Sequence, residues 1–312
     1  MTSDAGWFIH FTGTNETRPS TETACKKLVS ANSALVASFE IEILFEILLE
    51  SYRGVEEFGL LNSLRWSTEE SLDNILEVAR RRAQANSTVM FALTAQQTYK
   101  DQAKRHLKKV CENTKGKNYF KDRWNALEKT VPEMLLVRAI RNHTQHGGMP
   151  VCSLKTGHRS NESEIYTQLV MSTIEAGSDN PQFAEDIKPL RETIPKDVEL
   201  MHILRVMIHH LHELHQDLRS RFIEPAAKVA VHTIADAVKE FTSDPWTQYP
   251  LAVISQDPKR MKPRKDVIVS IGSYVAFERL ARTNSFKYRP VSERIVQRLH
   301  ADSVINPHIY PS

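Results

Sequence analysis

Residues 132–150 read PEMLLVRAIRNHTQHGGMP, and this stretch contains the last part of a helix predicted over about 119–146, together with the end of that helix. At about 100° per residue, Leu136, Val137 and Ile140 fall on one side and form an apolar face for a core. The opposite side gathers polar side chains of a kind rare on ordinary solvent faces, where Lys and Glu dominate: Arg138, Arg141, Asn142, Gln145 and His146. His143 lies at the border of the apolar side, and we predict that it is a packed structural histidine.

The helix is expected to stop at Gly147-Gly148 and Pro150. Glycine can take the left-handed conformation of a helix cap, and proline cannot continue the backbone ladder. Val151 to Lys155 and Ile165 to Ile174 then predict the two strands of a β-hairpin within 150–175. A connector or short helix is expected from Pro181 to Ile194.

The polar stripe fits cleavage of RNA by its own 2′-hydroxyl. A neutral imidazole can remove the 2′-OH proton, and a guanidinium can hold the phosphate as it gains charge. His146 would lie in the last helical turn, where the helix dipole favours its charged form. The nucleophile is already tethered beside the phosphorus, so this chemistry requires no metal.

Arg141, Asn142 and His146 also carry a family resemblance. Four residues separate Arg141 from His146, and the first of them, Asn142, is polar. This pattern resembles the motif of HEPN domains, which are helical modules that include RNA-cleaving members. The glycine pair and the hairpin after the motif resemble a bacterial HEPN-like group. The resemblance covers roughly residues 25–220, although the bare Arg-to-His spacing also occurs elsewhere, as in Arg205 to His210.

The resemblance implies a homodimer whose two motif helices face each other across a shared cleft. It implies metal-independent endoribonuclease activity that leaves a 2′,3′-cyclic phosphate, often in a toxin or phage-defence effector with an antitoxin or other defence-system partner. Gly148 stands where some HEPN toxins have a Tyr that a partner nucleotidyltransferase modifies, so that form of neutralisation is not expected. The alternative is a non-catalytic HEPN-like scaffold that binds a protein or RNA partner, and a third hypothesis is a defence regulator whose basic tail senses nucleic acid.

Apolar periodicity predicts further helices around the motif, so the predicted fold class is mainly α, a HEPN-like bundle with the small hairpin. The predicted helices cover about 21–52, which ends near Gly54 and Gly59, 67–111, 119–146, 197–221 and 225–241. Residues 1–20 are predicted to be an irregular lead-in before a helical domain at 21–244. LAVISQ and DVIVSI predict two strands beyond it, with a further helical piece near 292–299.

Residues 245–312 are predicted to form a basic extension of mixed structure. From Asp257 to Asp302 there are 11 Lys/Arg against 5 Asp/Glu, a local net charge of +6, whereas the whole chain carries +3. A basic segment can follow phosphates, and a solvated surface explains it equally well. Besides Arg138 and Gln145, the candidate RNA-binding residues lie in the loop PKRMKPRK: Lys259, Arg260, Lys262, Arg264 and Lys265.

The run HHLHELH, residues 209–215, has histidines at helical spacing but is not HExxH. The pairs His212/His215 and His209/His212 lack a third carboxylate or cysteine ligand, so no metal site is predicted there. Phosphate-binding loop, dinucleotide and nucleophile-elbow motifs are absent, so no cofactor is expected.

Composition and charge give a general setting for the chain. The 312 residues have the composition of a normal globular protein, without an apolar run of about 18 residues or a signal-like start. Three scattered cysteines argue against a disulfide framework and fit a reducing compartment. The expectation is therefore a cytoplasmic protein with no membrane partner.

Overall fold

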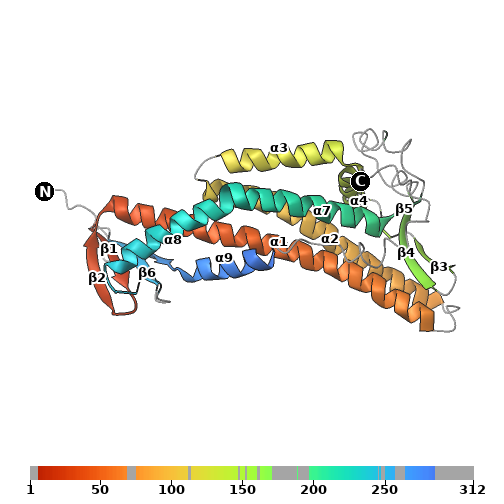
Figure 1. The fold of residues 1–312 in the computed structure, drawn as a ribbon, viewed down its shortest axis with the longest axis horizontal. Helices are drawn as coiled ribbons and strands as arrows, with labels where there is room; N and C mark the ends of the chain where they lie inside the picture. Colours follow the sequence, from red (N-terminus) through yellow and green to blue (C-terminus); the bar gives the residue numbers. More distant parts are fainter. Residues whose placement is uncertain are drawn as a thin grey trace.

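The computed structural model describes residues 6–68, 75–111, 114–146, 148–151, 153–159, 162–170, 188, 197–244, 246, 250–256 and 264–284. The chain is mainly helical, as predicted. Long helices run nearly side by side along the molecule, with one small sheet at each end (Figure 1). The longest of them are α1 (Glu22–Thr68), α2 (Ile75–Val110) and α7 (Leu200–Leu218), and α8 (Glu224–Lys239) continues from the end of α7.

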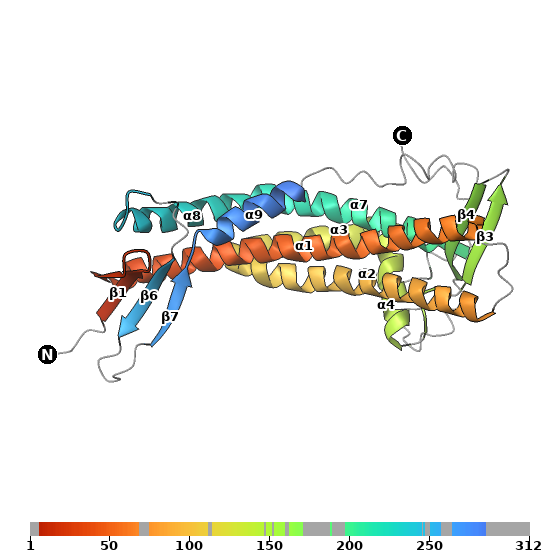
Figure 2. The same cartoon turned by 90° about the horizontal axis from the view of Figure 1, so that it is seen from below.

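Two shorter helices follow α2 and carry the sequence motif. The helix α3 (Lys115–Thr130) packs on α2 and α7, and α4 (Pro132–His146) crosses the long helices at a steep angle (Figure 2). The expected single helix over 119–146 is wrong, because the chain breaks at Val131, which is extended at φ −114° and ψ 105°. A residue before proline disfavours the helical region, and Pro132 then fits the first turn of α4 because it has no N–H to offer.

The helix α1 extends well beyond the end predicted near residue 52. Gly54 and Gly59 lie inside it, because isolated glycines weaken a helix without stopping one that is held by packing. A Cβ on Gly59 would lie 2.9 Å from Cε of Met201, so this glycine leaves room for the start of α7. Ser67 and Thr68, predicted to open the second helix, are instead the last residues of α1.

The predicted irregular lead-in is also wrong, since residues 6–20 form a hairpin of β1 (Gly6–Phe11) and β2 (Glu16–Ser20). Asn15 closes its turn at φ 57°, a conformation that Asn tolerates better than most residues. Ile9 and Phe11 share one face of β1 by strand alternation and are buried. The Thr, Gly and Asn content of residues 1–20 suggested a loop, but among the described residues only 12–15 form the turn.

The described part of the C-terminal extension joins this hairpin. The strands β6 (Leu251–Gln256) and β7 (Arg264–Val269) match the two predicted ones, and the sheet has the order β2-β1-β6-β7. The helix α9 (Gly272–Thr283), which was not predicted, lies against α1. The first and last parts of the described chain therefore form one structural unit, whereas the helical piece expected at 292–299 lies outside the described residues.

At the other end of the bundle, β3 (Ser153–Arg159) and β4 (Glu162–Val170) form the predicted hairpin. A third short strand, β5 (Asp197–Glu199), pairs with β4 and leads directly into α7. The hairpin thus connects the end of the motif helix to a central helix of the bundle. The connector expected from 181 to 194 lies outside the described residues, apart from Lys188.

The helices α7 and α8 are joined by a π-helical turn, η1 (Arg219–Ile223), in which the N–H of Glu224 donates to the carbonyl of Arg219. Pro225 explains this turn, because proline has no N–H and its ring clashes with the carbonyl four residues earlier. One extra residue in the turn lets the helix continue past the proline. π-turns inside helices often lie at functional sites.

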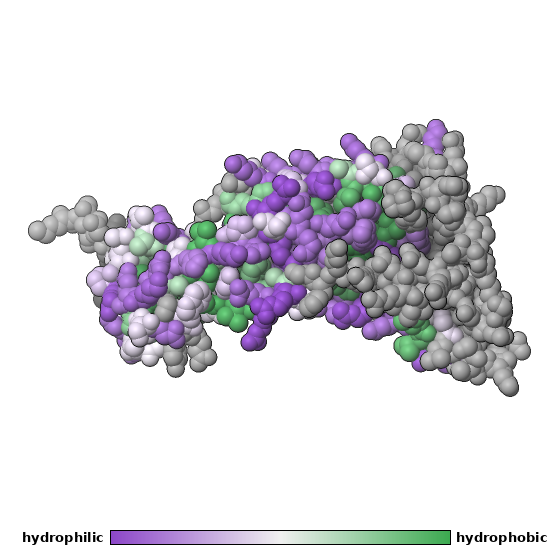
Figure 3. Space-filling view, in the orientation of Figure 1, coloured by the Kyte–Doolittle hydropathy of each residue, from purple (hydrophilic) through white to green (hydrophobic). Residues whose placement is uncertain are grey.

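The segment Glu22–Ser63 of α1 is long and apolar enough to cross a membrane by length and composition alone. A core helix passes the same test, and Leu35, Ile41, Phe45 and Leu48 of α1 are completely buried against neighbouring helices. Hydrophilic side chains run along much of the described face in Figure 3, with smaller apolar patches between them. The core of this bundle therefore accounts for part of the apolar side chains of α1, whereas Ile47, Leu60 and Leu61 are more than 40% exposed.

Candidate functional site

The motif helix α4 is amphipathic, as its sequence predicts. Leu136, Val137 and Ile140 are at most 1% exposed and pack on the neighbouring helices, among them α7 and α3. Glu133 in the first turn suits the positive end of the helix dipole. Burial of this face fixes the rotation of α4 and thereby directs the opposite, polar face away from the core.

Arg141 and Asn142 lie next to each other on the polar face and are half-buried. A guanidinium Nη1 of Arg141 donates to Oδ1 of Asn142 at 3.3 Å. Within the described residues the Arg141 side chain makes no other hydrogen bond or ion pair. Gln145 is exposed one turn further on, and His146 is the last residue of α4 but its side chain lies outside the described set.

Arg138 shares the polar stripe but has a partner in the fold. Its Nη1 lies 3.3 Å from Oε2 of Glu128, a carboxylate that also accepts from Lys100 at 2.5 Å and from the indole of Trp124 at 2.8 Å. Burial alone would raise the pKa of Glu128, but Lys100, Trp124 and Arg138 together lower it. Arg138 therefore helps to join α4 to α3, and its charge is less available to RNA than that of Arg141.

His143 is a packed histidine, as predicted, with 2% of its surface exposed and its pKa lowered by burial. Neither ring nitrogen has a hydrogen-bond partner among the described residues. Gly148 covers the ring, and a Cβ at that position would lie 3.0 Å from Nε2. The helix ends at His146, close to where it was expected to end, and the N–H of Gly148 donates to the His143 carbonyl at 3.1 Å, although Gly148 does not take the left-handed conformation.

The chain after the motif helix is held by Asn86 of α2. The buried Asn86 amide accepts from the N–H of Val151 at 2.9 Å and donates to its carbonyl at 3.2 Å. Arg82 donates to the same carbonyl at 3.2 Å. The Asn86 side chain thus pairs with the Val151 backbone as a residue of a neighbouring β-strand would, and it holds the segment after α4 against α2. No local sequence pattern predicted this role.

Most of the candidate RNA-binding loop is outside the described residues, which include neither Lys259, Arg260 nor Lys262. Arg264 and Lys265 are the first residues of β7, and their side chains are likewise outside the described set. The sheet that carries this loop stands at the end of the bundle opposite the β3–β4 hairpin (Figure 1). The strand β7, which begins with Arg264 and Lys265, therefore lies at the other end of the bundle from the β3–β4 hairpin that follows the motif helix (Figure 2).

A groove of about 740 Å³ lies between the inner face of this sheet, α1 and the end of α2. Its walls combine the indole of Trp7 with Val29, Val253 and Val267, and with the cations Lys26, Lys108 and Lys109. Lys26 pairs with Glu22 at 2.6 Å, whereas Lys108 and Lys109 have no ion pair among the described residues. An aromatic wall beside unpaired cations suits a group that has both a ring and a negative charge.

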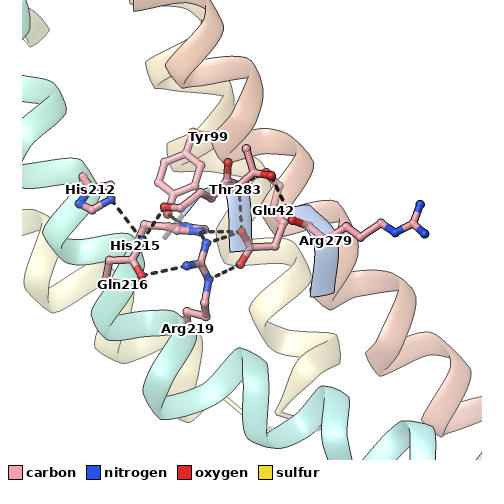
Figure 4. A network of polar contacts seen from close by, with 9 residues as sticks. Glu42, Tyr99, His212, His215, Gln216, Arg219, Arg279 and Thr283 are labelled. Carbon is pink, nitrogen blue, oxygen red and sulfur yellow. Dashed lines mark hydrogen bonds and ion pairs between the residues drawn. The ribbon is translucent and has the colours of Figure 1, made fainter. Parts of the chain in front are cut away.

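The bundle contains a buried polar network that sequence reasoning missed (Figure 4). Its centre is an ion pair between Glu42 of α1 and Arg219 of η1, with Nε at 2.7 Å from Oε1 and Nη2 at 2.6 Å from Oε2. Glu42 is 0% exposed and Arg219 5%. Burial acts to raise the pKa of Glu42, but His215 and Arg219 lower it to about 2, so the carboxylate stays charged.

His215 extends the network to α2. Its Nδ1 forms a hydrogen bond of 2.9 Å with the Tyr99 hydroxyl, and its Nε2 lies 3.2 Å from Oε2 of Glu42. The ring stacks on Phe45 at 3.8 Å between centroids. Burial lowers the pKa of His215, and the neighbouring Glu42 carboxylate acts against this shift.

Asn284, immediately after α9, completes the network from the C-terminal side. Its amide donates to the carbonyl of Glu42 at 3.2 Å and to Oε2 at 3.0 Å, and its own carbonyl accepts from Gln216 at 2.9 Å. Five elements of the fold therefore meet at one charged pair. Because all its members are buried or nearly so, we assign this network to positioning the helices.

Comparison with known proteins gives no relative: no family model, no curated protein and no solved structure matches the chain.

Proposed function

We propose that this protein is a metal-independent endoribonuclease of the HEPN type. The observation that carries the proposal is the half-buried Arg141–Asn142 pair on the outer face of α4, whose guanidinium keeps its charge for an anion. The planar guanidinium matches the oxygens of a phosphate. Helix α4 ends within a few residues of the pair, and His146 is its last residue.

In this proposal Arg141 binds the scissile phosphate and His146 acts as the general base. The imidazole takes the proton from the 2′-hydroxyl, the 2′-oxygen forms a bond to phosphorus, and the bond from phosphorus to the 5′-oxygen breaks. The imidazolium supplies the proton with which the 5′-oxygen leaves. Arg141 offsets the extra charge on the phosphate in the transition state, and Asn142 orients Arg141 through its amide oxygen.

We further propose that the active form is a homodimer in which two copies of α4 face each other. The position of α4 supports this, because the helix stands across the bundle (Figure 2) and Gln145 on its polar face is exposed. A dimer would bring two Arg141 side chains to one RNA. In a cellular setting such an enzyme would act as a toxin or defence effector under the control of a partner protein.

The test is cleavage of total cellular RNA by purified protein in excess EDTA. We expect fragments from the wild type and none from His146→Ala or Arg141→Ala. His232→Ala is the matched control, since His232 is an exposed histidine on α8 away from α4. Cleavage that survives in a folded His146→Ala protein would refute the assignment of the general base.

The groove beside Trp7 favours a second candidate, an RNA-binding module without catalysis. A base could stack on the indole while Lys108 and Lys109 contact phosphates. In that case Lys108→Glu with Lys109→Glu would abolish binding of a single-stranded RNA, and Arg141→Ala would leave binding unchanged. The opposite pattern of effects would favour the motif helix.

A further inference from the structure

Three metal-ligating side chains come together on the outer face of α7: His209, His210 and Glu213. One nitrogen of each imidazole and one oxygen of the carboxylate all lie within 4.8 Å of one another. The carboxylate faces both rings, with Oε1 at 3.6 Å from Nε2 of His209 and Oε2 at 3.5 Å from Nδ1 of His210. All three residues belong to a single helical stretch, so their backbones are already fixed.

These separations match metal coordination better than hydrogen bonding. A hydrogen bond of this kind would place the atoms roughly 2.7–3.2 Å apart. Two ligand atoms on a tetrahedral zinc ion, with bonds of about 2.0–2.1 Å, lie roughly 3.4 Å from each other. The two nitrogen–oxygen distances therefore need only small side-chain rotations to accommodate an ion.

The structure also separates these ligands from the other histidines of the run. His212 and His215 face the core, where His215 belongs to the network around Glu42. The sequence suggested the pairs His212/His215 and His209/His212, and the fold excludes both as accessible sites. The third ligand that those pairs lacked is Glu213, which the helix places four residues after His209 and three after His210.

The surroundings of the cluster favour a cation. Glu133, in the first turn of α4, has an oxygen 3.8 Å from Nε2 of His202, which lies two turns before His209 on α7. Its negative charge also acts on His210. His209 and Glu213 are 53% and 61% exposed, so an ion and its water ligands can reach them from solvent.

We propose that His209, His210 and Glu213 form a binding site for a divalent transition-metal ion of the zinc class, with water completing the coordination. Two imidazoles and one carboxylate prefer such an ion to magnesium or calcium, which take oxygen ligands. The proposal does not rest on the proposed ribonuclease activity, because that chemistry uses α4 and proceeds in EDTA. The site is therefore additional to the motif, and either can fail without the other.

The test is titration of the protein, expressed without a histidine tag, with Co²⁺ followed by visible absorption and with Zn²⁺ followed by calorimetry. We expect one ion per chain to bind at this site in the presence of excess Mg²⁺, with the visible bands of nitrogen- and oxygen-ligated cobalt. His209→Ala, His210→Ala and Glu213→Gln should each weaken binding by about ten-fold or more.

His232→Ala removes an exposed histidine elsewhere and should leave the titration unchanged. Because the cluster lies on the surface, the variants are expected to keep the circular dichroism and melting temperature of the wild type. Equal binding by wild type and Glu213→Gln, or no binding by the wild type, would overturn the proposal.

Discussion

Replacing Arg219 by Met tests the buried network most severely. The change removes both contacts of the guanidinium with Glu42, at 2.7 and 2.6 Å, and leaves a carboxylate that is 0% exposed without its main cation. Breaking a buried ion pair in this way costs about 3–5 kcal/mol. We therefore expect Arg219→Met to lower the free energy of unfolding by that amount at pH 7.5.

The double variant Glu42→Leu, Arg219→Met should recover most of this loss, because replacing both partners by apolar groups is often neutral. The assay is urea unfolding followed by circular dichroism for the wild type, both single variants and the double variant. Once Arg219 is gone, burial raises the pKa of Glu42 in the folded state, so this carboxylate already binds a proton there in mild acid. The single variant should therefore take up fewer protons on unfolding in mild acid than the wild type does. A loss below about 1 kcal/mol for Arg219→Met would refute the reasoning, since it would mean that water reaches the pair.

Three further predictions concern the neighbourhood of the motif helix. Gly148→Ala should destabilise the fold by about 1–3 kcal/mol, because the new Cβ would lie 3.0 Å from Nε2 of His143. Thermal melting measures this loss, and a second substitution, His143→Ala, should reduce it. Asn86→Ala should lower the free energy of unfolding by about 2 kcal/mol and speed hydrogen exchange at the Val151 amide, because Val151 loses both of its hydrogen bonds to the Asn86 amide. Unchanged exchange at Val151 would contradict this prediction. Burial lowers the pKa of His143 and of His215 in the folded state. The free energy of unfolding should therefore be highest above about pH 6.5 and fall in acid, by at most about 1.4 kcal/mol per histidine at pH 5.5. His143→Phe should make the free energy of unfolding depend less on pH.

The sequence predicted the helical class because apolar residues recur at helical spacing, as at Leu35, Phe39 and Ile43 of α1. It also predicted the end of the motif helix and the hairpin that follows. The break before Pro132 was missed although the proline was visible, because the apolar pattern continues on both sides of it. The hairpin at 6–20 was missed because its partner strand, β6, lies some 240 residues later in the chain and only the tertiary fold brings them together.

The candidate site was predicted in part. The amphipathic pattern placed Arg141, Asn142 and Gln145 on a face away from the core, but it could not show that Arg138 is bound by Glu128. The central network left one local signal, the charged Glu42 between Ile41 and Ile43 within an apolar helix. Its partners lie far along the chain, so no spacing rule could join them. The proposed metal cluster was not predicted, because the sequence suggested only the pairs His212/His215 and His209/His212, and Glu213 did not fit the HExxH spacing.

The chemistry of the RNA ends tests the central claim most directly. Total RNA is incubated with the wild-type protein in excess EDTA, and the ends of the fragments are mapped. The proposed attack of the 2′-hydroxyl predicts 2′,3′-cyclic phosphates together with 5′-hydroxyls, and the loss of both with His146→Ala. Fragments with 3′-hydroxyls and 5′-phosphates would contradict the account, because they require an attacking water in place of the 2′-hydroxyl.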